Sequence, residues 1–188
     1  LQTLIAHLDT VIFTVYGREN MISDKIKDIL NEQINKEFYS AYLYLAMSAY
    51  FSEIGLYGFS HWTKIQSREE IDHGMILFEY VLNRKSQIRL KSLESPSLDL
   101  KGPLDVFEQI YKHERAITTS IDCVASLSEG ECDLATRNFI DWYLKEQTEE
   151  EASVLRIISK LKAFGEEKSA LYLIDRELSS REYSPSSY

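Results

Sequence analysis

The chain has 188 residues, a formal net charge of −9, two cysteines, seven glycines and three prolines. This length fits one domain, and so few glycines and prolines disfavour an all-β fold with its many turns and favour long helices. The negative charge argues against nucleic acid as a partner, because phosphate binding requires a basic face.

The same counts indicate where the chain works. No apolar run approaches the ~20 residues that cross a membrane, so we expect no membrane partner. Cys123 and Cys132 do not form a Cys-x-x-Cys motif, and two cysteines exclude a disulfide scaffold. This usage is typical of a reducing compartment, so we expect a cytoplasmic protein.

Residues 1–20 differ from the rest of the chain. They are mildly apolar but have neither the basic start nor the small-residue cleavage site of a signal peptide. Met21 then opens a regular amphipathic pattern. We therefore expect the natural chain to begin at Met21 and residues 1–20 to be an upstream translation or an artefact. The alternative is a genuine N-terminal extension packed on the outside.

The predicted domain, residues 21–180, consists of four long helices and a short one. Glycines and prolines mark their ends. The expected bounds are Ile22 to about Glu53, Phe59 to about Lys85, Pro103 to about Glu129, about Asp133 to Phe164 and about Glu167 to Leu178. Residues 181–188 are polar, and we expect a flexible tail there.

The connection over residues 86–102 sets the topology. Short turns join the first helix to the second and the third to the fourth, so each pair is antiparallel. The connection between the pairs has roughly 17 residues, which can extend to ~55 Å, the length of a whole helix. The sequence therefore predicts an all-α four-helix bundle with one long crossover and a short fifth C-terminal helix.

Each long helix carries an apolar seam at alternating spacings of three and four residues, and each seam includes a glutamate near its middle. These glutamates are Glu37, Glu70, Glu114 and Glu150. A buried carboxylate costs several kcal/mol unless it is compensated, and no Lys or Arg lies near them on the seams. A multivalent cation is the remaining compensator.

Glu70 and His73 form a Glu-x-x-His motif, which places both side chains on one helix face. Four or five carboxylates with one imidazole suit two iron or manganese ions, and the absence of thiolates disfavours a structural zinc site. Alternatively, all four glutamates could lie on solvated faces, which would require a wrong phase for every seam.

Other residues have two interpretations each. Tyr44 follows Glu37 by two turns and is either a core residue or a partner of the metal centre. Glu69, Glu146 and Glu149 lie just off the seams and are either surface charges or ligands of a third cation. A second apolar stripe on the first helix predicts a subunit interface; its members are Tyr39, Tyr42, Leu43, Ala46, Ala49 and Tyr50.

Five segments over residues 21–180 resemble bacterial non-haem ferritin, a family of ferritin-like di-iron bundles. They are LNEQINKEFYSAYLYLAMSAY, REEIDHGMILFEYVL, YKHERAIT, FIDWYLKEQTEEE and SALYLIDRELS. The resemblance implies iron storage: a ferroxidase oxidises Fe(II) with oxygen or hydrogen peroxide and deposits ferric mineral in a shell of 24 subunits.

The resemblance also assigns ligands. Glu37, Glu70 and His73 match the first ferroxidase iron, and Glu70, Glu114 and Glu150, with Gln147 nearby, match the second. Tyr44 matches the family's tyrosine beside the centre. Glu69, Glu146, Glu149 and Glu150 match a third iron site.

Related classes fit less well. Haem-containing bacterioferritin and rubrerythrin-like peroxidases usually carry a second Glu-x-x-His, whereas the fourth helix here has Gln147-x-x-Glu150. We therefore expect no haem. A structural light-type ferritin chain would lose centre ligands, and none is missing. A DNA-protecting mini-ferritin would be shorter and would place its ligands across a subunit interface.

Overall fold

The structure is a computed structural model that describes residues 22–97, 99–165 and 167–186, and the expectation for residues 1–20 lies outside this part. The described residues form five helices: α2 (Asp24–Glu53), α3 (Tyr57–Asn83), α4 (Pro103–Gly130), α5 (Leu134–Phe164) and α6 (Lys168–Leu178). The all-α class is confirmed. None of these helices is both long enough and apolar enough to cross a membrane.

Local sequence signals explain where the helices begin. The Ser23 hydroxyl accepts a hydrogen bond from the Ile26 amide at the start of α2, and Asp133 caps α5 by accepting from the Thr136 amide. Pro103 occupies the first turn of α4 after Gly102, whose φ of 99° suits glycine. The predicted ends agree with the observed ones to within about three residues.

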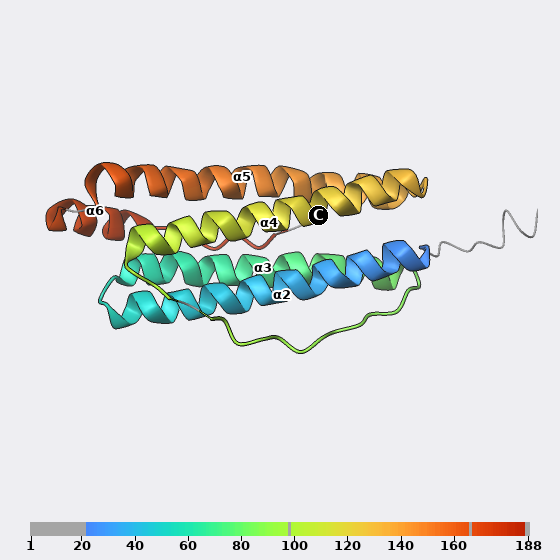
Figure 1. The fold of residues 1–188 in the computed structure, drawn as a ribbon, viewed down its shortest axis with the longest axis horizontal. Helices are drawn as coiled ribbons and strands as arrows, with labels where there is room; N and C mark the ends of the chain where they lie inside the picture. Colours follow the sequence, from blue (N-terminus) through green and yellow to red (C-terminus); the bar gives the residue numbers. More distant parts are fainter. Residues whose placement is uncertain (1–21, 98, 166, 187–188) are drawn as a thin grey trace, which may run out of the picture.

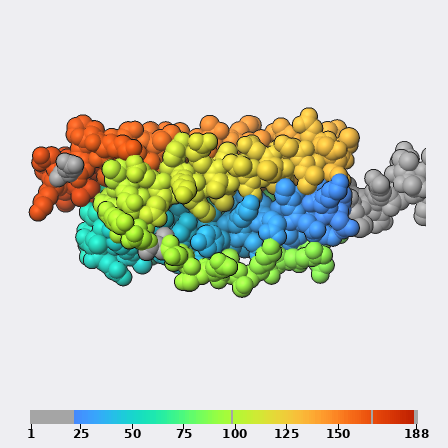
Figure 2. Space-filling view, viewed as in Figure 1, coloured from blue at the N-terminus to red at the C-terminus, as the bar shows by residue number. Residues whose placement is uncertain are grey.

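The helices pack as two antiparallel pairs, α2 with α3 and α4 with α5 (Figure 1). The crossover connects opposite ends of the bundle, as predicted. It runs along the length of α2 and forms a ridge beside it (Figures 1 and 2). Asn31 and Asn35 hold it there. Their side-chain oxygens accept from the amides of Arg89 and Lys91, at 2.5 and 2.7 Å.

The core has two apolar clusters with a polar layer between them. One cluster includes Phe51, Phe59 and Phe107 and extends to α6. The other includes Leu30 and Leu77 and fills the opposite half of the bundle. Along every long helix the seam glutamate lies between residues of the two clusters, so the carboxylates share one level. The apolar spacing of the fourth predicted helix also placed Phe164 on its seam, and this prediction is wrong because Phe164 is 60% exposed.

Helix α6 packs against the beginning of α3. The Asp175 carboxylate accepts hydrogen bonds from the amides of Gly58 and Phe59, at 2.8 and 3.0 Å. These amides belong to the first turn of α3, where helical N–H groups have no partner within the helix. Gly58 permits this approach, because a Cβ there would lie 1.6 Å from the Asp175 carbonyl oxygen.

The described part of the C-terminal tail, residues 181–186, lies along α3 and is hydrogen-bonded to it. The Tyr183 hydroxyl donates to Asp72 at 2.6 Å, and a ring nitrogen of His61 lies 2.8 Å from the Arg181 carbonyl oxygen. The sequence predicted a flexible tail, and in the structure these residues contact α3. Composition alone gave no sign of the acceptors that α3 offers them.

Candidate metal centre

The four long helices bring six polar side chains into the layer between the two apolar clusters. They are Glu37 from α2, Glu70 and His73 from α3, Glu114 from α4, and Gln147 and Glu150 from α5. All of these residues except Glu150 are at most 2% exposed. Glu150 is slightly more open, with 12% of its side chain accessible. The sequence-predicted ligands therefore meet inside the bundle.

Their ligand atoms form two groups that share one residue. Atoms of Glu37, Glu70 and His73 lie within 4.8 Å of one another, and so do atoms of Glu70, Glu114 and Glu150. Glu70 belongs to both groups. Two cations could therefore lie side by side with the Glu70 carboxylate between them.

Neutral amides orient the carboxylates. Gln33 donates to Glu37 at 2.7 Å, and Gln66 donates to Glu70 at 3.0 Å and to Glu150 at 2.9 Å. Each glutamine precedes its glutamate by four residues, which places both side chains on the same helix face. This repeated Gln-x-x-x-Glu spacing was the signal that could have identified Gln33 and Gln66 from sequence.

Gln147 and Tyr44 both contact Glu114. Gln147 donates from its amide nitrogen to Glu114 Oε2 at 3.1 Å, and the Tyr44 hydroxyl donates to Glu114 Oε1. The Tyr44 ring is fully buried. Both interpretations of Tyr44 therefore hold together, since it is a core residue and also a partner of a centre carboxylate.

His73 is fixed by its surroundings. Its Nδ1 lies 3.5 Å from Glu70 Oε2 and 3.9 Å from Glu150 Oε1. Its carbonyl oxygen accepts from the Tyr143 hydroxyl at 2.7 Å, and the Trp142 ring packs edge-on against the imidazole with centroids 5.5 Å apart. The imidazole is thus directed toward the carboxylates.

The carboxylates of the centre hold protons more tightly than exposed glutamates do. Burial raises the pKa of Glu70 well above its ordinary value of 4.5, and the nearby charges of Glu114 and Glu37 raise it further. Burial likewise raises the pKa of Glu37, Glu114 and Glu150. Four acids crowded in one apolar layer resist ionisation unless a cation joins them.

The donor set fits metal cations. Among the described residues, Glu37 Oε2 and Glu150 Oε2 are buried without a hydrogen-bond partner. In that part of the chain the four centre carboxylates form no ion pair with Lys or Arg, and Glu70 and Glu150 lie near His73 instead. Buried charges in proteins are paired or bind metals, and carboxylates with one imidazole suit iron or manganese.

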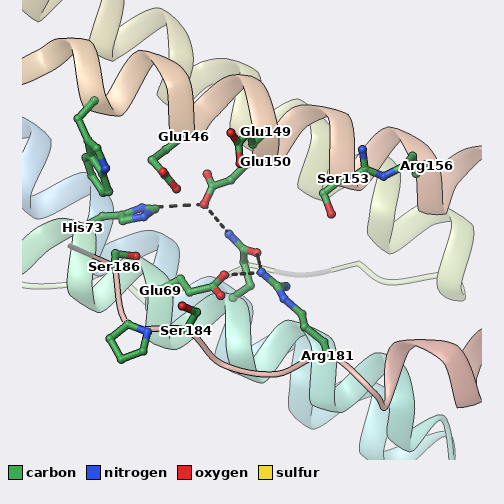
Figure 3. A pocket seen from close by; sticks show the side chains of 13 residues that line it. Glu69, His73, Glu146, Glu149, Glu150, Ser153, Arg156, Arg181, Ser184 and Ser186 are labelled. Atoms are coloured by element: carbon green, nitrogen blue, oxygen red, sulfur yellow. Dashed lines mark hydrogen bonds and ion pairs between the residues drawn. The ribbon is translucent and has the colours of Figure 1, made fainter. Parts of the chain in front are cut away.

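Glu69, Glu146 and Glu149 line a cavity of about 430 Å³ beside the centre (Figure 3). The cavity shares Gln66, His73 and Glu150 with the centre. Glu69 forms an ion pair with Arg181 of the tail, a residue that sequence reasoning did not single out. Neither of the two tight ligand groups in the described part of the chain includes these three outer glutamates.

The fold and site define a class of protein, a four-helix bundle that encloses a carboxylate-rich metal centre. The sequence profile named "Ferritin-like domain" matches residues 27–164. The chain belongs to the ferritin family.

Two relatives span nearly the same length. The chain is 36% identical over 161 residues to the bacterial non-heme ferritin of Bacteroides fragilis, covering 86% of this chain and 100% of the relative. It is 40% identical over 156 residues to that of Campylobacter jejuni, covering 83% and 93%.

Solved structures are similar as well. An open pore ferritin from the hyperthermophilic archaeon Archaeoglobus fulgidus superposes with a TM-score of 0.84 at 46% identity, covering 86% of this chain and 98% of that one. A closed form of that ferritin, engineered by site-directed mutagenesis, gives 0.85 at 45% identity, covering 87% and 99%. The ferritin-like bundle with its short C-terminal helix is confirmed.

Proposed function

We propose that this chain is an iron-storage protein whose bundle is a ferroxidase. Fe(II) is the substrate, it binds at the di-iron centre, and the ferric product is deposited as mineral inside an oligomeric shell. The observation that carries the proposal is the shared position of Glu70 between two ligand groups. Membership of the ferritin family supports iron as the cation.

Two adjacent Fe(II) ions supply the number of electrons that either oxidant requires. Each Fe(II) gives up one electron, so a pair supplies the two electrons that reduce dioxygen to hydrogen peroxide with uptake of two protons. When hydrogen peroxide is the oxidant instead, two electrons and two protons reduce it to two waters. A site that holds two ferrous ions together can therefore complete either reaction without a separate electron donor.

The residues of the chain have distinct tasks in this proposal. Glu37 and His73 hold one iron, Glu114 and Glu150 hold the other, and Glu70 lies between them. Gln147 and Tyr44 hydrogen-bond Glu114 and keep its carboxylate in place. Since ionised carboxylates bind cations best, iron binding is expected to release the protons that burial retains on these acids.

The number of subunits, the oxidant, the compartment and a third iron site are proposals as well. We propose that the shell contains 24 copies, that oxygen or hydrogen peroxide is the oxidant, and that the protein works in the cytoplasm. Ferritin relatives support a shell, and the exposed part of the α2 stripe supplies an apolar contact surface. Glu69, Glu146, Glu149 and Glu150 are proposed as ligands of a third iron.

The test is aerobic oxidation of Fe(II), followed by absorbance of the ferric product. Glu70→Ala removes the ligand common to both groups, so the initial rate at two irons per chain is expected to fall at least about tenfold. Glu79→Ala is the matched control, because Glu79 is an exposed glutamate on the same helix. Equal rates for wild type and Glu70→Ala would overturn the proposal.

A further inference from the structure

Arg181 of the tail reaches into the acidic cavity beside the metal centre (Figure 3). Its guanidinium donates to the Glu69 carboxylate and, at 2.9 Å, to the side-chain oxygen of Gln66. It also lies 4.4 Å from the centre of the Trp62 ring, a cation–π distance. Three different groups of α3 therefore position one positive charge.

This ion pair is largely shielded from water. The side chains of Arg181 and Glu69 are 23% and 16% exposed. Burial lowers the pKa of Arg181 below its ordinary value, and the charge of Glu69 opposes that shift. A shielded, charge-assisted hydrogen bond is among the stronger side-chain contacts in proteins, unlike an exposed salt bridge.

The guanidinium lies one side chain from the centre. Gln66 accepts from Arg181 and donates to both Glu70 and Glu150. The cavity that Arg181 enters is lined by four carboxylates, those of Glu69, Glu146, Glu149 and Glu150. Such a cavity attracts cations. Two arginines of the described chain line it, Arg156 of α5 and Arg181 of the tail, and Arg181 is the one that pairs with Glu69.

We propose that Arg181 occupies the place of the third cation, so that the C-terminal tail competes with metal for Glu69 and a third ion binds only when the guanidinium withdraws. The inference rests on the proposed function and concerns its outer site. A divalent cation bound to Glu69 would lie next to the guanidinium, and the repulsion between them makes the two occupants mutually exclusive. Arg181 is thus a residue that determines how tightly the third ion binds.

The test is a calorimetric titration with Zn(II), a redox-inert probe, on the full assembled chain. Arg181→Gln keeps a polar side chain but removes the charge. We expect this variant to bind one more Zn(II) per chain than wild type, or to bind the third ion about ten- to hundredfold more tightly, the range of one charged hydrogen bond.

Two controls identify the source of the extra binding. Arg176→Gln removes an exposed arginine of α6 that does not line the cavity, and it is expected to bind like wild type. Glu69→Gln combined with Arg181→Gln removes the ligand for which metal and guanidinium compete, so the gain is expected to disappear. Helix content by circular dichroism checks that all variants fold.

The titrations give two separate quantities, the ions that both proteins bind and the difference in binding between them. The ions bound in common by wild type and Arg181→Gln report on the centre, and their absence would contradict the proposed function. The difference between the two proteins reports on the tail. Equal stoichiometry and equal affinity for every ion in wild type and Arg181→Gln would overturn the inference, and so would an equal gain in Arg176→Gln.

Discussion

Glu70 illustrates how one residue can be costly to the fold and necessary for the site. It is 2% exposed and lies close to three other carboxylates, those of Glu37, Glu114 and Glu150, so its ionised form is disfavoured in the folded chain. In the described chain the hydrogen bond from Gln66 favours its ionised form, and the His73 ring nitrogen lies 3.5 Å from its carboxylate. A carboxylate at this position is costly to stability, and the proposed cation site accounts for it.

The stability of the metal-free protein is expected to depend on pH. The folded chain keeps protons on Glu70 and Glu150 more tightly than the unfolded chain does, because their pKa values are raised. The free energy of unfolding is therefore expected to fall as pH rises above about 4.5, the ordinary pKa, toward the raised values. Thermal unfolding between pH 4.5 and 8 measures the fall.

Glu70→Gln removes one of the carboxyl groups that bind a proton in the folded chain. The free energy of unfolding of this variant is therefore expected to decrease less steeply as pH rises. Glu79→Gln, on the exposed face of α3, is expected to retain the wild-type slope. Added metal should raise the melting temperature most at the upper end of the range, since cations replace protons there. If the metal-free wild type became more stable as pH rose from 4.5 to 8, the predicted direction of the pH dependence would be contradicted.

Part of the site could be predicted residue by residue. Glu37, Glu70, His73 and Glu114 lie on seams whose period is fixed by the helix, so their convergence followed from spacing. Arg181 could not be predicted, because its partner Glu69 is 112 residues away and the tail has no periodic pattern. Contacts made by irregular segments depend on acceptors that only the folded bundle displays.

At the scale of elements, α6 depends on one glycine and one carboxylate. Asp175 caps α3 through Gly58 and Phe59, and Gly58 leaves room for the backbone of α6. The sequence predicted that α6 exists but not where it docks. Its docking position follows from the exposed N–H groups at the start of α3, which need an acceptor.

Gly58→Ala is expected to displace α6 and to lower the free energy of unfolding by about 1–3 kcal/mol, the range for overpacking. Gly130→Ala is a matched control, since a Cβ there meets nothing within 4 Å. Chemical denaturation measures the change, and proteolysis near residues 166–180 reports on α6 directly. Equal stability of the two variants would show that the close approach does not matter.

For the crossover, the topology could be predicted from sequence but the path along α2 could not. Its length alone fixed the topology, because only an extended segment can join two ends of a bundle. Its path along α2 depends on Asn31 and Asn35, whose side chains also donate to the carbonyl oxygens of Gln87 and Arg89. Two asparagines one turn apart are too common in helices to have predicted this contact.

At the scale of the whole molecule, the apolar stripe on α2 is the surface most suited to contact between chains. Tyr42 is 43% exposed, and Ala49 is exposed as well. Leu43 instead faces the core, and the Tyr50 hydroxyl accepts from the Gly102 amide at the end of the crossover. The exposed stripe is thus narrower than the sequence pattern predicts. Its exposed part, which includes Tyr42 and Ala49, is not covered by other described residues of the chain.

Tyr42→Glu is expected to prevent complete assembly by placing a charge on this stripe. Twenty-four chains of 21.9 kDa would weigh about 530 kDa. Light scattering after size exclusion should give that mass for wild type and for Lys112→Glu, which changes an exposed residue of α4. Tyr42→Glu should elute as smaller particles with unchanged helix content, and a full-size particle would exclude this surface as a necessary interface.

Anomalous diffraction at the iron edge, from crystals of the assembled protein loaded with Fe(II) without oxygen, tests the central claim most directly. We predict two peaks per chain on either side of the Glu70 carboxylate, one near His73 and Glu37 and the other near Glu114 and Glu150. A single peak, or iron bound only outside the four-helix layer, would contradict a di-iron centre.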